Sequence, residues 1–319
     1  MSGSFWHALV FALSVTLPSI LLLVLGWFLR RSGQIDERFC DQASKIVFRY
    51  SLPALLFFSI YGNKVNFSSQ IRLIAAGAVA SLILFVGAEF IAARMRLPTT
   101  DKGVFVQGVY RSNTMVAGLA FIANAYGAEG VAVGAVFGGA MTLLYNVLAV
   151  VTLNQNTAGS RRAQLIHFAR HLSTNPLILG IVLALLAKAI KLPVSPLLVQ
   201  TGGYLAAIAL PLALICAGAT LNVQALFKVS DIAIGASLGR LIASPIIAIL
   251  MGLAFGLNGL SMGVLFMMMA TPVAAASYVM AKAMGANEIA AANIIGITTV
   301  GAMPIAAAGI AILRSLGWI

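Results

Sequence analysis

Apolar residues fill this chain in long blocks, and polar residues gather in the short intervals between them. Each block is about 20 residues long, which is enough for an α-helix to cross about 30 Å of hydrocarbon. The intervals leave no room for a soluble domain. The pattern predicts an all-α polytopic membrane protein with ten transmembrane helices, near residues 8–29, 40–62, 71–93, 103–125, 129–153, 174–190, 199–221, 231–255, 260–284 and 288–313.

Composition agrees with this pattern and excludes an ordinary soluble domain. Hydrophobic residues make up 61% of the chain and charged residues 9%, against about 25% charged residues in soluble domains. The net charge of +12 would suggest nucleic acid in a soluble protein. Here the basic residues lie mostly in short loops, so we expect them to set the orientation, with no nucleic acid as partner.

The distribution of basic residues predicts the orientation in the membrane. Of the 20 Lys and Arg residues, 13 fall on the side opposite the N-terminus, 5 on the N-terminal side and 2 inside spans. Because basic loops face the cytoplasm, both termini are predicted to lie outside. The N-terminal MSGSFWH lacks the basic region of a cleavable signal peptide, so the first span should remain as a helix of a multi-pass protein in the cytoplasmic (inner) cell membrane.

The second half of the chain repeats features of the first half at one fixed offset. An ungapped shift of 158 residues superposes Pro18 on Pro176, Pro53 on Pro211, Gly77 on Gly235 and Gly127 on Gly285. Such internal duplications are common in transporters. We therefore predict two units of five helices, residues 1–158 and 159–319. Because five is odd, the second unit enters the membrane from the opposite side, and the repeat is inverted.

The repeat places two helix breaks at matching positions. Thr271-Pro272 in the ninth span maps onto Asn113-Thr114 in the fourth span, inside a polar cluster about ten residues into the bilayer. At 1.5 Å per residue this depth is about 15 Å, the middle of the membrane. Thr271 and Asn113 are good N-cap residues, and proline is favoured at the first helical position. A new half-helix is therefore predicted to begin at each break; for Pro272 alone, an ordinary kink is the alternative.

Two half-helix N-termini that meet at the membrane centre predict an anion site. Each presents unpaired N–H groups and about half a positive charge. Arg111 would add a full charge and two parallel donors suited to a carboxylate or phosphate. Asn146 and Asn293, inside the fifth and tenth spans, could line the same pocket or bond across helices as packing contacts. The candidate substrate-binding residues are Arg111, Ser112, Asn113, Thr114, Thr271, Pro272, Asn146 and Asn293.

Two further ionisable residues fall within the predicted spans. Arg240 lies some nine residues into the eighth span, where a charge should face protein or a water-filled cavity, unless it extends toward the cytoplasm. Glu89, near the cytoplasmic end of the third span, could be a proton carrier, a partner for Arg240 or a solvated interfacial residue. The sequence leaves both roles open.

The chain offers no recognisable catalytic or metal-binding pattern. It has no intramembrane pair of aspartates, no His and Glu cluster at metal-ligand spacing, and no serine with a plausible base. We therefore expect no enzyme activity, no catalytic residues, no bound metal and no cofactor.

Four stretches, in this order along the whole chain, resemble the auxin efflux carrier (AEC) family, which includes plant PIN-formed carriers and bacterial permeases for malate and malonate. They are LPSILLLVLGWFLRRSGQID from Leu17, KIVFRYSLPALLFFSI from Lys45, SNTMVAGLAFIANAYG from Ser112 and ATPVAAASYVMAKAMGAN from Ala270.

The resemblance implies a ten-helix fold of two repeats in which helices 4 and 9 are broken and cross, with the substrate carboxylate held at the crossover. It also implies alternating access by an elevator-like or rocking motion. Carried over to this chain, the crossover falls on Asn113 with Thr114 and on Thr271 with Pro272. The PIN-formed carriers have proline at both crossovers, and bacterial members often end the first motif in Gly-x-Pro. Here Thr114 and Ala120 stand in those places.

The function expected from these features is secondary active transport of a small organic anion, with a carboxylate as the favoured substrate. The rival is an anion channel or a ligand-sensing membrane protein that uses the same central site. The expected partners are the carboxylate and the lipid bilayer. Whether a proton or sodium ion is coupled to transport, and whether the chain forms a homodimer, stays open.

Overall fold

The computed structural model describes residues 2–62, 70–153, 174–221, 230–283 and 285–319, and these residues are almost entirely helical. Besides helices, the described part contains one isolated β-bridge and no strand. The helices of the first half are α1 (Ser2–Arg31), α2 (Glu37–Ile46), α3 (Leu52–Gly62), α4 (Ile71–Arg94), α5 (Thr99–Tyr110) and α6 (Leu119–Leu153). Those of the second half are α8 (Pro176–Ala189), α9 (Pro196–Ala207), α10 (Ala209–Ala219), α11 (Asp231–Leu238), α12 (Ser244–Ala254), α13 (Gly259–Met269), α14 (Ala276–Ala283) and α15 (Glu288–Ser315).

Three short π-helical turns complete the described helices. They are η1 (Val47–Ser51), η3 (Thr114–Gly118) and η5 (Gly239–Ala243). η1 joins α2 to α3 and η5 joins α11 to α12, so each pair forms one continuous helix. η3 continues directly into α6. Short π-helical insertions of this kind are frequent at functional sites, and η3 and η5 lie next to the site described below.

Seven helical segments of the described chain are long and apolar enough to cross a membrane. A helix satisfies all its backbone hydrogen bonds internally, which a membrane span requires. Two shorter apolar helices, α8 and α13, accompany them. The segments are Trp6–Arg31, Glu37–Gly62, Ile71–Arg94, Thr114–Leu153, Pro196–Ala219, Asp231–Ala254 and Glu288–Ser315. The fold is therefore that of an all-α, multi-pass membrane protein.

The outer surface of these helices is apolar, as a lipid-facing surface must be. On α1, the large side chains of Leu17, Leu21, Val24 and Phe28 are exposed. Small residues of the same helix, such as Ala12, are fully buried. Small residues that face the interior let membrane helices approach closely. The large apolar side chains are therefore left on the outside, where they can contact lipid.

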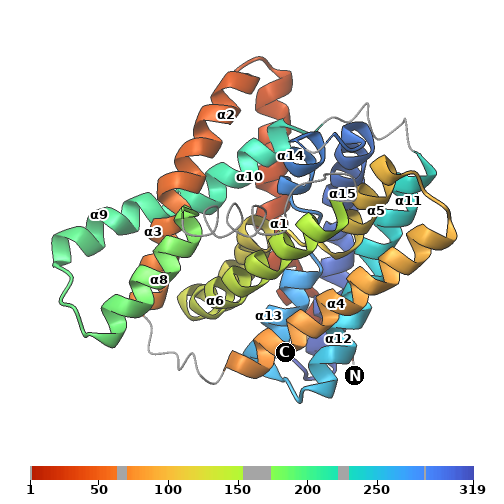
Figure 1. Cartoon of the computed structure of the whole chain (residues 1–319). Helices are drawn as coiled ribbons and strands as arrows, with labels where there is room; N and C mark the ends of the chain where they lie inside the picture. The colour runs from red at the N-terminus through yellow and green to blue at the C-terminus, as the bar shows by residue number, and fades with distance from the viewer. Residues whose placement is uncertain (1, 63–69, 154–173, 222–229, 284) are drawn as a thin grey trace.

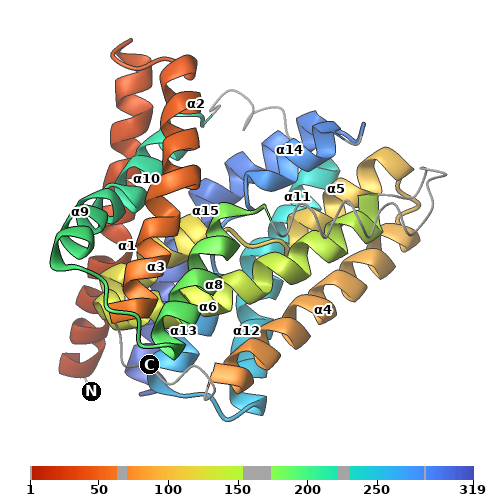
Figure 2. The same ribbon diagram turned by 60° about the vertical axis from the view of Figure 1, so that its left-hand side comes forward.

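The helices form two groups that meet at α6 and α15 (Figures 1 and 2). One group contains α1, α2, α3, α8, α9 and α10, in which α1 packs on α10 and α3 packs on α8 and α9. The other contains α4, α5, α11, α12, α13 and α14, in which α4 packs on α5 and α12, α5 on α11, and α13 on α12. Both chain ends lie at the same end of the molecule (Figures 1 and 2).

The contact between α1 and α10 depends on two glycines. A Cβ on Gly26 would collide with the carbonyl oxygen of Ile215, and one on Gly218 with that of Leu23. Each glycine therefore lets the backbone of the opposite helix come within contact distance, as small residues do at helix interfaces in membranes. This contact ties the first group together across both halves of the chain. The expected unit boundary at 158/159 lies outside the described residues.

Candidate functional site

Two helices are interrupted in the middle of the second group. The first interruption lies between α5, which ends at Tyr110, and η3, which begins at Thr114. The second lies between α13, which ends at Met269, and α14, which begins at Ala276. Both interruptions fall where the sequence predicted breaks. Both contain buried side chains: Arg111 is 5% exposed and Thr271 is 0% exposed.

The two interruptions pair with each other. Ser112 and Val273 form an antiparallel bridge, in which the Asn113 N–H donates to the Pro272 carbonyl at 2.9 Å and the Ala274 N–H donates to the Arg111 carbonyl at 3.2 Å. The remaining Val273 N–H donates to Oγ1 of Thr298 at 3.1 Å. Non-helical backbone is tolerated at membrane depth only where protein or water satisfies it. Here two backbone hydrogen bonds join the two breaks. Pro272 fits this position because it has no backbone N–H that would need a partner.

Arg240 holds the ends of both interrupted helices from the η5 turn. Its guanidinium donates to the carbonyls of Val109 and Tyr110 at 3.2 and 3.0 Å, at the C-terminus of α5. It also donates to the carbonyl of Met269 at the C-terminus of α13 and to Oγ of Ser244. The last carbonyls of a helix lack partners within it and carry a partial negative charge. Arg240 therefore neutralises two such ends at once.

The position of Arg240 shows which way its side chain points, which the amino-acid sequence left open. The side chain is 0% exposed, so it does not extend toward the cytoplasm. Its contacts also exclude Glu89 as its partner, because Glu89 forms an ion pair with Lys102 at 2.7 Å and accepts a hydrogen bond from Thr152. Arg240 therefore adjoins the crossover, as Arg111 does.

Arg111 occupies a different electrostatic environment from Arg240. Its Nη2 donates to Oδ1 of Asn146 at 2.7 Å, and its Nη1 contacts the carbonyl of Tyr145 at 3.4 Å and the sulfur of Met280 at 3.3 Å. All three acceptors are neutral. The ion pairs found among the described residues, Arg30 with Glu37 and Lys102 with Glu89, do not involve it. The guanidinium is thus buried against α6 and α14, and among the described residues no carboxylate pairs with it.

A network of hydroxyl groups supports this region. The Tyr145 hydroxyl donates to Oγ of Ser112 at 3.3 Å, and Oγ of Ser81 donates to the Tyr145 hydroxyl at 3.4 Å. The Tyr110 hydroxyl donates to the Tyr145 carbonyl at 3.4 Å. Together these contacts link α4, α5 and α6 around the first break, and they fix α6 where Asn146 can meet Arg111.

The sequence of the chain is similar to sequences of known membrane transport proteins. The model of a family described as "Membrane transport protein" matches residues 11–159 and 150–309, which is nearly the whole chain. The chain belongs to this membrane transport protein family. A relative described as an "Uncharacterized transporter", from Methanothermobacter thermautotrophicus, is 26% identical over 273 residues, which cover 83% of this chain and 87% of the relative. Transport across a membrane is thereby the function of the family, and the auxin efflux carrier resemblance is supported at this broader level.

Both half-helix starts of this membrane transport protein differ in detail from the sequence prediction. Asn113 does occupy the N-cap position of η3, but its side chain makes no capping hydrogen bond. Thr271 does not cap the second half-helix, which begins five residues later at Ala276. Its hydroxyl donates instead to the carbonyl of Met268, at the end of α13. The prediction of a cap at Thr271 is wrong because the irregular segment is long enough to pair with the first break before the helix resumes.

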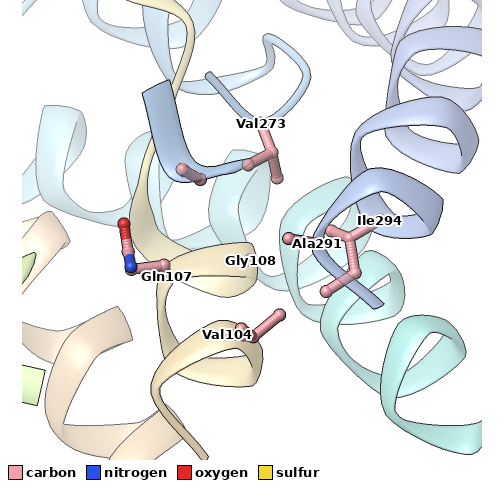
Figure 3. A pocket seen from close by; sticks show the side chains of 7 residues that line it. Val104, Gln107, Gly108, Val273, Ala291 and Ile294 are labelled. Atoms are coloured by element: carbon pink, nitrogen blue, oxygen red, sulfur yellow. The ribbon is translucent and has the colours of Figure 1, made fainter. Parts of the chain in front are cut away.

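The structure brings most of the candidate residues of this membrane transport protein together. Arg111, Ser112 and Asn113 form the first break, and Thr114, 2% exposed, opens η3. Thr271 and Pro272 lie in the second break, and Asn146 contacts Arg111 across helices. Asn293 is buried on α15, next to Ile294, which lines a small cavity together with Gln107 and Val273 (Figure 3).

Several residues of this membrane transport protein lie at the crossover although the sequence did not single them out. Tyr145 and Ser81 belong to the hydroxyl network, and Thr298 completes the backbone hydrogen bonding of the second break. Thr298 lies in an apolar helix and carries no sequence signal beyond being polar. Among the described residues, no group of three or more His, Cys, Asp and Glu side chains could hold a metal ion.

Proposed function

We propose that this membrane transport protein is a secondary carrier that moves a small organic anion with a carboxylate group, held at the crossover of the two interrupted helices. Transport itself follows from the family. The anion site is the new element of the proposal. Its residues would be Arg111, Ser112, Asn113, Thr114, Thr271, Pro272, Asn146 and Asn293.

The observation that carries the proposal is the contrast between the two buried arginines. Arg240 is balanced by the negative ends of α5 and α13. Arg111, which lies between the end of α5 and the start of η3, contacts only neutral groups among the described residues. Holding an unbalanced charge at this depth costs several kcal/mol. A bound carboxylate would supply the missing charge and accept two parallel hydrogen bonds from the guanidinium.

An inverted repeat of ten crossings is part of the proposal, and several features of the chain support it. In addition to the seven long segments, α5 with η3, α8, and α13 with α14 would each provide a crossing, since Gly127, with a φ of 58°, divides the Thr114–Leu153 segment. Gly285, 158 residues after Gly127, also has a positive φ, 68°. Gly33 and Lys191, separated by the same interval, have positive φ as well.

Alternating access is the transport mode that we propose, and the two helix groups support it. The first group contains α1, α2 and α3 from the first half of the chain and α8, α9 and α10 from the second half, at the corresponding places in the repeat. Both breaks belong to the other group. A movement of the second group against the first would carry the crossover, with its ligand, between the two sides of the membrane, as in carriers built from inverted repeats.

Counterflow distinguishes a carrier from an anion channel or a sensor. We expect proteoliposomes loaded with an unlabelled carboxylate to accumulate the labelled compound transiently above its equilibrium level, and to do so with saturation. Arg94→Gln, which changes an exposed arginine at the end of α4, should behave as the wild type. Uptake that rises linearly with concentration, without overshoot, would show a pore.

We also propose that both termini face the outside of the cytoplasmic membrane, on the distribution of basic residues. In a variant without Cys40 and Cys216, a maleimide that cannot cross the membrane should label Ser315→Cys in intact cells. It should leave Ser32→Cys, at the other end of α1, unlabelled until the cells are broken; both positions are exposed. The reverse pattern of labelling would show that the orientation is inverted.

A further inference from the structure

One face of the helix formed by α2 and η1 carries a line of polar side chains. Four exposed residues recur on it at intervals of four, three and four positions: Arg38, Gln42, Lys45 and Arg49. Intervals of three and four place side chains on one face of a helix. The opposite face is buried, with Cys40 and Ala43 packed against α10. The polar line therefore points away from the rest of the protein.

The part of this face formed by Lys45 and Arg49, called the basic pair below, carries positive charge alone. The acidic residues of α2, Glu37 and Asp41, lie nearer its start, where a negative charge suits the helix N-terminus. None of the ion pairs found among the described residues includes Lys45 or Arg49. One turn, about 6 Å, separates the two residues along the axis, so their long side chains can contact the same anion.

The basic pair lies where this helix passes from a polar to an apolar stretch. The segment Glu37–Gly62 has 26 residues and is about 39 Å long, which exceeds the about 30 Å of hydrocarbon in a membrane. Its polar end therefore reaches the headgroups, and the hairpin of α1 and α2 extends beyond the other helices (Figures 1 and 2). Phe48 and Tyr50, beside the pair, are both exposed. Aromatic and long basic side chains are typical of the region between hydrocarbon and headgroups.

The corresponding helix in the second half of the chain has no such charges. At the offset of 158 residues, Lys45 corresponds to Gly203 and Arg49 to Ala207, which both lie on α9 and are both exposed. A Cβ on Gly203 would meet no atom within 4 Å, so a side chain has room there. An exposed helix face at this place in the fold therefore does not need basic residues, and the basic pair has a cause other than packing.

We propose that Lys45 and Arg49 bind the headgroup of an anionic phospholipid such as phosphatidylglycerol. The lipid phosphate accepts two parallel hydrogen bonds from the guanidinium and a further one from the ammonium group. Its acyl chains lie along the exposed apolar residues that flank the pair, such as Ile46. A zwitterionic headgroup has no net negative charge to offer, so the pair favours the anionic lipid. This site lies in the first helix group, away from the crossover, and does not depend on the proposed carboxylate site.

The test is native mass spectrometry of the purified protein in a neutral detergent, titrated with dioleoyl phosphatidylglycerol or dioleoyl phosphatidylcholine. The wild type should bind the first phosphatidylglycerol at least about fivefold more tightly than phosphatidylcholine. Lys45→Gln and Arg49→Gln should each weaken phosphatidylglycerol about fivefold, and the double variant about 25-fold, because each basic residue near an anionic membrane surface contributes about that factor. The affinity for phosphatidylcholine should stay nearly unchanged.

Arg94→Gln combined with Arg96→Gln is the matched control, since it removes two exposed basic residues at the end of α4. This control should keep the preference for phosphatidylglycerol. Lys45→Arg keeps the charge and should bind as the wild type does. Equal affinity of the wild type for the two lipids, or a preference that the Lys45→Gln and Arg49→Gln double variant keeps, would overturn the proposal.

Two other occupants of this face give different results. If the pair bound a soluble anion, inorganic phosphate would raise the melting temperature of the wild type, but not of the double variant, above the effect of sodium chloride at equal ionic strength. If the face were an interface between two copies of the chain, the double variant would change the proportion of dimers in the mass spectra and leave lipid binding unchanged. Either result would overturn the lipid site; we expect neither.

Discussion

Arg111→Gln should lower the affinity for the transported carboxylate far more than tenfold while folded protein still reaches the membrane. Removing one partner of a buried, hydrogen-bonded charge pair costs about 2–5 kcal/mol. The substitution keeps a polar side chain of similar length, which can still contact Oδ1 of Asn146, the acceptor that Arg111 holds at 2.7 Å. The measurement is ligand-induced stabilisation of the purified protein, because a ligand that binds only the native state raises its melting temperature.

Arg111→Lys and Arg94→Gln complete this comparison. A lysine keeps the charge but cannot form two parallel hydrogen bonds with a carboxylate, so Arg111→Lys should lie between the wild type and Arg111→Gln. The exposed Arg94 has no part in the site, and Arg94→Gln should bind as the wild type does. Unchanged affinity in Arg111→Gln, with a wild-type response to added carboxylate, would remove Arg111 from the site.

Arg240→Met should chiefly destabilise the protein. It leaves the carbonyls of Val109 and Tyr110 without the hydrogen bonds that end α5, while Ser244 still donates to the Met269 carbonyl at 2.9 Å. At about 1–3 kcal/mol for each of these two unpaired buried groups, the free energy of unfolding should fall by at least about 2 kcal/mol. The melting temperature without ligand measures this loss, and transport should be lost with it because the two breaks are no longer held.

Ser244→Ala is the graded control for Arg240→Met. It removes a second donor from the Met269 carbonyl but leaves Arg240 in place, so its melting temperature should fall by much less. Arg111→Gln should also lower the melting temperature without ligand less than Arg240→Met does, because relief of an unbalanced charge offsets the lost contacts. Equal melting temperatures for Arg240→Met and the wild type would contradict the role given to Arg240.

The sequence predicted where the helices break because a break has a local chemical cause. Pro272 removes a backbone donor, and the polar residues after Tyr110 can satisfy backbone groups that a helix leaves free. The single offset of 158 residues then related the two breaks, and the bridge between Ser112 and Val273 joins them. These features depend on the residue types and on their order, so they can be predicted from the sequence.

The orientation of individual side chains could not be predicted from the sequence. Position within a span gives the depth of Arg240, but the rotation of its helix and the bulge of η5 decide that the side chain points at two helix ends. Thr271 was predicted to be an N-cap because it precedes a proline. In the structure the residues after it pair with the first break, and α14 begins only at Ala276.

The most direct measurement of the central claim is an experimental structure of the protein bound to the carboxylate that stabilises it most. The carboxylate should lie within hydrogen-bonding distance of the Arg111 guanidinium, at the pairing of residues 111–113 with 271–275. Density for the ligand at another place, with the Arg111 guanidinium still bonded only to Asn146, Tyr145 and Met280, would contradict the crossover as the anion site.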